Sequence, residues 1–310
     1  MRTSETVDLV RVLERAQLAA LPQSAIHLIQ LSQDADNGPA EFAVPIESDP
    51  GLAGQVLRFV NSSYFGFRQE VSSVKLAISL VGVRTIKNFA MWSAVFSLMP
   101  NPRCGPFDLR RLWQDSLRRA VFARAFGRLL GLAEAEDLFA AALLQDMAVP
   151  LLANELPGHY RQLLEARASG RSRLSDLERE LFGWTHAQAG SLLARRWGLP
   201  EAFAALVDTH TESPDNVAQG RITANAAAVA LSSLMPSECD EEWSEQFAFE
   251  ELYGALLGQR APLLAEFFAR VDRDFADFAP LLKVATPPRS LVDSLTAPHA
   301  GRLASAVAAT

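Results

Sequence analysis

The sequence predicts an all-α fold, because three features of the chain favour helices over strands. Apolar side chains recur three and four residues apart, the spacing of one helix face. Alternating stretches long enough to suggest a sheet are absent, and residues that start and stop helices divide the apolar pattern. With 310 residues, 49% of them hydrophobic, the chain can bury the core of one large domain or two small ones.

A first group of helices is predicted over residues 20 to about 100. One of them should begin at Asp49-Pro50, where an acidic N-cap precedes proline at the first helical position. Leu52, Val56, Phe59 and Val60 then fall on one face, and Asn61-Ser62-Ser63 should end the helix. The breaker-rich segment 100–106 cannot stay helical, so it is the predicted linker to a second group.

The second group is predicted over residues 107 to 212. Ser175 with Glu178, and Thr185 with Gln188, each have the spacing of a capping box at a helix start. Gly198-Leu199-Pro200 should stop the helix that follows Thr185, because glycine permits a left-handed turn and proline cannot continue the helix.

The remaining segments are predicted to flank these two groups. Residues 1–19 form a helical lead-in, and residues 213–284 form a C-terminal helical extension with an alanine-rich core helix from Ile222 to Leu234. Residues 285–310 contain three prolines and many small side chains, so the sequence predicts a weakly ordered tail there.

Composition restricts the possible functions. A formal net charge of −7 argues against nonspecific nucleic-acid binding, which depends on neutralising phosphates. No apolar run approaches the roughly 20 residues that span a bilayer, and no signal-peptide pattern begins the chain. Only Cys104 and Cys239 are present, which predicts no disulfide framework and favours a reducing compartment. We therefore expect a cytoplasmic protein that does not bind membranes.

Several motifs follow one another in a recognisable order. They are Leu21-Pro22, Ile46-Glu-Ser-Asp49-Pro50-Gly-Leu52, Leu57-Arg-Phe-Val-Asn61-Ser62, Trp113-Gln-Asp115, the segment 137–146, Phe182-Gly-Trp184-Thr185-His186 and Trp197-Gly-Leu199-Pro200. In this order they resemble the HDOD domain, the HD-related output domain of bacterial signalling proteins, over residues 20 to 212. The resemblance implies a multi-helix HD-like bundle of two packed subdomains, 20–100 and 107–212.

The same resemblance bears on metal binding. In HD phosphohydrolases a His-Asp pair holds a catalytic divalent metal, and here Gln145-Asp146 stands at that position. A carboxamide binds transition metals weakly. The ligand positions that the resemblance leaves are Asp115, Asp146, His186 and His210, so it implies a vestigial site with no metal, no cofactor and no catalytic residue. Three convergent ligands could still hold zinc, which keeps a residual metal-dependent phosphohydrolase open as an alternative.

Two of these residues also have structural interpretations. His186 follows Thr185 at a predicted helix start, where it can serve in capping. Asp146 lies in an otherwise apolar segment, so we expect a buried partner for it, such as an arginine, a hydroxyl or a backbone amide.

Arginines are concentrated between residues 101 and 130, a segment that contains seven arginines and only two aspartates. Arg110, Arg111, Arg118 and Arg119 recur at near-helical spacing and predict a surface for a partner or an anion, such as an acidic helix or a nucleotide. A solvated helix face is the alternative. A third possibility is pairing with the acidic stretch 231–255, which would make these arginines structural.

The sequence therefore predicts a non-catalytic signal-transduction output or adaptor module that contacts another signalling protein. Besides the arginines, the turn Asn61–Phe67 is a candidate contact surface, because Tyr64, Phe65 and Phe67 crowd it. A residual phosphohydrolase and a sensor for a nucleotide, such as a cyclic dinucleotide, remain the alternatives.

Overall fold

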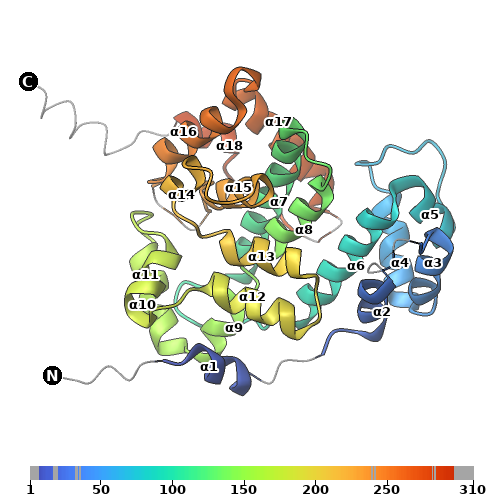
Figure 1. Ribbon diagram of the computed structural model, residues 1–310, viewed down its shortest axis with the longest axis horizontal. Coiled ribbons are helices and arrows are strands. Elements are labelled where there is room, and N and C mark those ends of the chain that lie inside the picture. The colour runs from blue at the N-terminus through green and yellow to red at the C-terminus, as the bar shows by residue number, and fades with distance from the viewer. Residues whose placement is uncertain are drawn as a thin grey trace, which may run out of the picture.

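The fold consists of helices packed into a small and a large lobe (Figure 1). A computed structural model describes residues 7–16, 20–31, 34, 36–238, 240, 242–280, 282 and 284–296. Every regular element in these ranges is helical, so the predicted all-α fold is confirmed. No helix in the same ranges is both long enough and apolar enough to cross a membrane.

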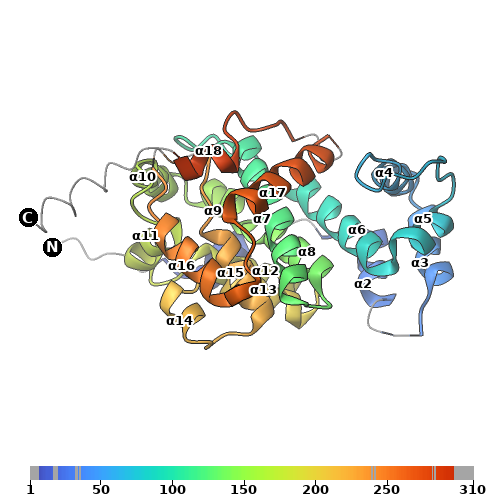
Figure 2. The same cartoon turned by 90° about the horizontal axis from the view of Figure 1, so that it is seen from above.

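The small lobe contains four helices of the first predicted group. They are α2 (Gln23–Leu31), α3 (Pro39–Glu47), α4 (Pro50–Val60) and α5 (Val74–Val81). The longer α6 (Val83–Leu98) contacts α2 in the small lobe and α8 in the large lobe, so it bridges the two (Figure 2).

The large lobe is built around α7 (Leu109–Leu130). This helix packs against α8 (Ala135–Leu144), α15 (Ala224–Ser233) and α17 (Leu264–Phe278). Because these neighbours cover it, side chains on nearly all of its faces are buried between residues 114 and 127. The central helix of the lobe is thus also the arginine-rich one.

The other helices complete the large lobe around this centre. They are α1 (Leu9–Arg15), α9 (Ala148–Glu155), α10 (Pro157–Arg167), α11 (Leu174–Phe182), α12 (His186–Arg196), α13 (Glu201–Thr209), α14 (Pro214–Ala218), α16 (Gln246–Leu257), the 3-10 turn η1 (Gly258–Arg260) and α18 (Leu291–Thr296). The lead-in helix α1 packs on α9 and α12. The rest of the predicted lead-in, residues 1–6 and 17–19, lies outside the described residues.

Most predicted helix ends are confirmed. The Asp49 carboxylate accepts a hydrogen bond of 3.0 Å from the Leu52 amide at the start of α4. Thr185 and Gln188 form the predicted capping box of α12. Gly198 has a φ of +70°, a left-handed conformation that glycine adopts without strain, and it lies just after the end of α12.

One local prediction is wrong. Ser175 and Glu178 do not cap a helix, because α11 already begins at Leu174 and both side chains are buried inside it.

The motif segment that contains Asp146 is interrupted by a turn, since α8 ends at Leu144 and α9 begins at Ala148. The intervening turn places Asp146 at a junction between helices.

The C-terminal extension packs against both lobes. The Phe278 ring of α17 lies 4.2 Å from the Tyr64 ring and 6.0 Å from the Phe59 ring of the small lobe, measured between centroids. It also lies 5.3 Å from Phe139 of α8. Tyr64 and Phe65 therefore pack against the core, and within the aromatic turn only the Phe67 ring is largely exposed.

Residues 285–296, the first part of the predicted tail, pack against the large lobe. The Gln114 side chain donates a hydrogen bond of 2.8 Å to the Ala285 carbonyl oxygen. The helix α18 packs on α17 and buries Leu291 completely. Contacts distant in sequence therefore order a segment of unremarkable composition. Residues 297–310 lie outside the described part of the chain.

We predict that Phe278→Ala lowers the free energy of unfolding by about 3–5 kcal/mol, because it opens a cavity where α17 meets both lobes. Chemical denaturation followed by circular dichroism measures this loss. Phe247→Ala is the matched control, since this ring is 79% exposed and its removal should change stability by less than about 0.5 kcal/mol. Equal effects of the two substitutions would contradict the packing of the extension.

Candidate functional site

Three of the four predicted ligand positions meet inside the large lobe. Asp146 comes from the turn between α8 and α9, His186 is the first residue of α12, and His210 directly follows α13. All three side chains are buried, and their ligand atoms lie within 4.8 Å of one another. The fold thus brings together residues that are up to 64 positions apart in the sequence.

Both imidazole rings face the same carboxylate oxygen. The Nε2 atoms of His186 and His210 lie 3.2 Å and 3.4 Å from Asp146 Oδ1, and 3.1 Å from each other. His210 Nδ1 lies 2.6 Å from the Val207 carbonyl oxygen, which can only accept a hydrogen bond. The Nδ1 atom of His210 therefore carries its proton, and its Nε2 atom accepts from His186.

A second carboxylate, that of Glu178, holds the other side of His186. Its Oε2 atom accepts a hydrogen bond of 2.7 Å from the His186 backbone amide and lies 2.6 Å from the ring Nδ1. Its Oε1 atom accepts a hydrogen bond of 2.6 Å from the Tyr160 hydroxyl. His186 is thus clamped between two buried acidic groups.

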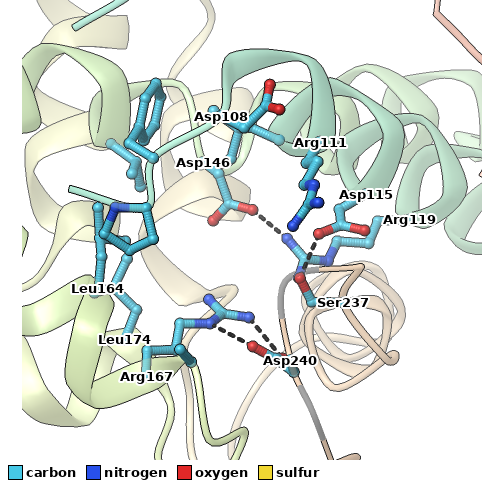
Figure 3. Close-up of a pocket in the computed structure, with 15 residues that line it drawn as sticks. Asp108, Arg111, Asp115, Arg119, Asp146, Leu164, Arg167, Leu174, Ser237 and Asp240 are labelled. Carbon is cyan, nitrogen blue, oxygen red and sulfur yellow. Dashed lines mark hydrogen bonds and ion pairs between the residues drawn. The ribbon is translucent and has the colours of Figure 1, made fainter. Parts of the chain in front are cut away.

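Arg119 occupies the remaining side of Asp146. Its Nη1 atom forms a buried ion pair with Asp146 Oδ2, the oxygen that the imidazoles do not contact (Figure 3). With His186 protonated, two carboxylates face one guanidinium and one imidazolium. The four formal charges then balance within the cluster, which we call the ionic centre: Arg119, Asp146, Glu178, His186 and the neutral His210.

The pKa values of the ionic centre follow from this arrangement. Burial alone would lower the pKa of His186, but the Glu178 and Asp146 carboxylates outweigh it and raise the pKa to about 9. Burial lowers the pKa of His210, so that ring stays neutral. Burial would raise the pKa of Asp146, yet Arg119 and the cationic His186 hold it well below its usual range. At neutral pH, Asp146 is a carboxylate and His186 a cation.

Asp115, the fourth predicted position, does not join the centre. Its Oδ1 atom accepts a hydrogen bond of 3.1 Å from the Glu238 amide, and its Oδ2 atom accepts another from the Ser237 hydroxyl. Burial raises the pKa of this carboxyl group. Asp115 therefore anchors the acidic stretch to α7.

The predicted arginine face does not form as one surface. Arg118 is buried and pairs with Glu238 at 2.6 Å, whereas Arg119 is buried against Asp146. Only Arg110 and Arg111 are exposed, at the start of α7. The other two are buried because α8, α15 and α17 surround the middle of α7. Pairing between the acidic stretch and the arginines, raised as an alternative, is confirmed for Arg118.

A pocket of about 100 Å³ lies beside the ionic centre (Figure 3). Leu112, Val149, Leu164 and Leu174 contribute its apolar wall. Three arginines and four aspartates line the pocket: Arg111, Arg119, Arg167, Asp108, Asp115, Asp146 and Asp240. Because their opposite charges nearly cancel, the pocket has no strong preference for an anion. Arg167 is already held by Asp240 through contacts of 3.0 Å and 3.1 Å.

Comparison with known proteins identifies the family. The sequence model of the HDOD domain matches residues 18–213. The chain belongs to the HDOD family.

Solved structures share the fold across most of the chain. An HDOD domain protein of unknown function from Geobacter sulfurreducens has a TM-score of 0.67 and 19% identity, and the match covers 88% of this chain and 97% of that one. A candidate phosphohydrolase from Shewanella amazonensis SB2B also has a TM-score of 0.67 and 19% identity, covering 90% and 99%. A candidate signal transduction protein from Marinobacter aquaeolei VT8 has a TM-score of 0.66 and 23% identity, covering 87% and 61%.

A curated relative matches part of the chain. An uncharacterized protein of Treponema pallidum (strain Nichols) is 23% identical over 195 residues. The match covers 63% of this chain but only 37% of that protein, so the chain spans little more than a third of the length of its relative.

Within this HDOD domain, Gln145 directly follows α8 and contacts α15. Its side chain is fully buried, and its Oε1 atom accepts a hydrogen bond of 3.4 Å from the Ser232 hydroxyl on α15. The Gln145 side chain is thus part of the packing between the end of α8 and α15.

The donor set itself is compatible with zinc. Separations of 3.1–3.4 Å among Asp146 Oδ1 and the two Nε2 atoms are close to the roughly 3.3 Å expected of tetrahedral ligands at about 2.0–2.1 Å from zinc. For zinc to bind, His186 would have to lose a proton, and the metal cation would compete with Arg119 for Asp146. A metal that bound here would be held by Asp146, His186 and His210.

Sequence reasoning missed Glu178 and the role of Arg119. Glu178 lies on the apolar stripe of α11, one turn after Leu174 and one turn before Phe182. A carboxylate in such a stripe is a signal for a buried ionic partner. Arg119 offered no comparable local signal, since its burial depends on helices far away in the sequence.

We predict that Arg119→Met lowers the free energy of unfolding by about 3–5 kcal/mol, because Asp146 then stays buried without its cation. Denaturant titration measures this. Adding Asp146→Asn should recover part of the loss, since it removes the orphaned charge. Arg110→Met is the matched surface control and should change stability by less than about 1 kcal/mol. A similarly small effect of Arg119→Met would contradict a structural ion pair.

We also predict that stability falls as the pH rises through the His186 transition. Its pKa is about 9 in the folded protein against 6.5 as the ordinary value. A raised pKa stabilises the fold fully below about pH 6.5, and this contribution of up to about 3 kcal/mol is lost by about pH 9. Denaturation at a series of pH values tests this in wild type and His186→Gln. Parallel pH curves for the two proteins would refute the assignment.

Proposed function

We propose that this HDOD protein is a non-catalytic signal-transduction module that acts by contacting another protein. The ion pair between Arg119 and Asp146 is the observation that carries the proposal. In an HD phosphohydrolase the aspartate at this position serves a catalytic metal. Here the guanidinium group supplies the positive charge that the carboxylate needs, so the cluster holds the fold together and does not activate water.

Two further features support a structural role for the ionic centre. Gln145 offers a weak ligand and is engaged with α15. His186 is protonated at neutral pH, so its Nε2 atom carries a proton where a metal would need a lone pair.

A metal-dependent phosphohydrolase is the second candidate, favoured by the ligand-like spacing of Asp146, His186 and His210. For that function Arg119 would have to leave Asp146. Deprotonating His186 at pH 7 would cost about 3 kcal/mol more, because its pKa is about 9. Both costs favour the non-catalytic role.

The small lobe offers a surface for the proposed partner. Val44 on α3 is 62% exposed, and Leu76 and Leu80 on α5 are 45% and 47% exposed. The two helices pack against each other, and Leu76 and Leu80 are one turn apart on the same helix face. Clustered apolar side chains on a surface are typical of protein interaction sites.

The two exposed arginines remain a second candidate surface. Arg110 and Arg111 lie at the start of α7, and Arg111 has no ion-pair partner among the described residues. They suit an acidic segment of a partner. A sensor for a nucleotide, the remaining alternative, would have to rely on these two, because Arg118 and Arg119 are paired internally.

We predict that contact with the partner depends on the surface and not on the ionic centre. Cross-linking and mass spectrometry in cells that naturally express the protein would identify the partner and quantify its recovery. Leu76→Lys with Leu80→Lys, or Arg110→Glu with Arg111→Glu, should reduce recovery at least about tenfold, equivalent to 1.4 kcal/mol of binding energy. Asp146→Asn at preserved fold should leave it unchanged.

The opposite pattern would reject the proposal. Recovery that survives both surface variants but is lost with Asp146→Asn would tie the partner to the chemistry of the ionic centre. Circular dichroism of each variant separates loss of contact from loss of fold.

A further inference from the structure

A second cavity lies far from the ionic centre, between the small lobe and the C-terminal extension. Its volume is about 510 Å³, within the range of small-molecule sites. The walls come from α4 of the small lobe, from the bridging helix α6 and from Pro280 and Leu282, which follow α17. We propose that this cavity, which we call the interlobe site, binds a small aromatic carboxylate.

Aromatic rings form one wall of the interlobe site. The Phe59 and Phe89 rings stack with centroids 4.3 Å apart, and Trp92 meets Phe89 edge-on at 5.0 Å. The centroid of the Phe96 ring lies 5.2 Å from that of Trp92. The same ring stacks on Trp113, with centroids 3.7 Å apart. Because each ring is held by another, the wall is formed before any ligand arrives. Such a wall favours a flat apolar body.

Charge at the site has a single sign. Among the described residues that line it, Arg58 is the one charged side chain, and none of these residues is acidic. Arg58 is exposed and has neither an ion pair nor a hydrogen bond to its side chain among the described residues. A guanidinium group in this state matches a carboxylate through two parallel hydrogen bonds.

Gln55 supplies a neutral donor beside Arg58. Its Oε1 atom accepts a hydrogen bond from the Ser93 hydroxyl, which fixes the amide and leaves its NH₂ group as a donor. One cation and one amide donor suit a single carboxylate. Phosphates of a nucleotide carry more charge and usually require several cations, so the lining favours a monocarboxylic acid over a nucleotide.

The interlobe site is independent of the proposed partner surface. Its residues lie on α4 and α6, whereas Val44, Leu76 and Leu80 lie on α3 and α5. A ligand there would contact both the small lobe and the segment after α17, so it would restrict movement between the two.

Isothermal titration calorimetry with 2-naphthoate tests the site on the full-length protein. We expect saturable binding to wild type, and Arg58→Gln should weaken it about tenfold or more, because a charge-assisted hydrogen bond contributes about 1.5–3 kcal/mol. Arg110→Gln removes an exposed arginine outside the site and is the matched control, with unchanged affinity expected. The uncharged 2-naphthamide should bind wild type and Arg58→Gln equally and more weakly than 2-naphthoate binds wild type.

A filling variant locates the site independently of charge. Ser97 is exposed on α6 and lines the cavity, so Ser97→Trp should block both probes without disturbing the core. No heat with 2-naphthoate and wild type would overturn the proposal. Equal affinity of 2-naphthoate for wild type, Arg58→Gln and Ser97→Trp would overturn it as well. Neither result would affect the proposed partner contact, which is measured on other residues.

Discussion

The buried ion pair between Arg119 and Asp146 is the constraint on which the interior of the large lobe depends. A carboxylate in this position without a cation would destabilise the fold by several kcal/mol. The pair joins α7 to the turn between α8 and α9. Asp146 then orients His186 and His210, and His186 in turn faces Glu178. Alternating charges on Arg119, Asp146, His186 and Glu178 thus connect four parts of the chain in the core, and the neutral His210 adds a fifth.

The same geometry underlies our proposal that this HD-like fold has a non-catalytic role. The three potential ligands keep a spacing that would suit a metal, because the helices that carry them are held by the surrounding core. What differs is the source of positive charge, which comes from Arg119 and protonated His186. In the proposed function, the ionic centre stabilises the fold, and the exposed side chains of α3 and α5 and the start of α7 contact the partner.

Local patterns in the sequence predicted the local structure well. Asp49, Thr185 and Gly198 act through nearby backbone groups, and each behaves as its neighbours indicate. The order of motifs identified the family and three members of the ionic centre. Burial of Arg118 and Arg119, the clamp by Glu178 and the packing of residues 285–296 depend on contacts between distant segments. Helical spacing alone carries no information about which of these faces another helix will cover.

The metal content of the purified, tag-free protein tests the central claim most directly. Mass spectrometry of the element content, after incubation with zinc and manganese salts and removal of free ions, would be compared between wild type and Asp146→Asn. The account predicts far less than one metal ion per chain in both proteins, because Arg119 already neutralises Asp146. A near-stoichiometric metal that is lost in Asp146→Asn would contradict it and would establish a working HD-type metal site.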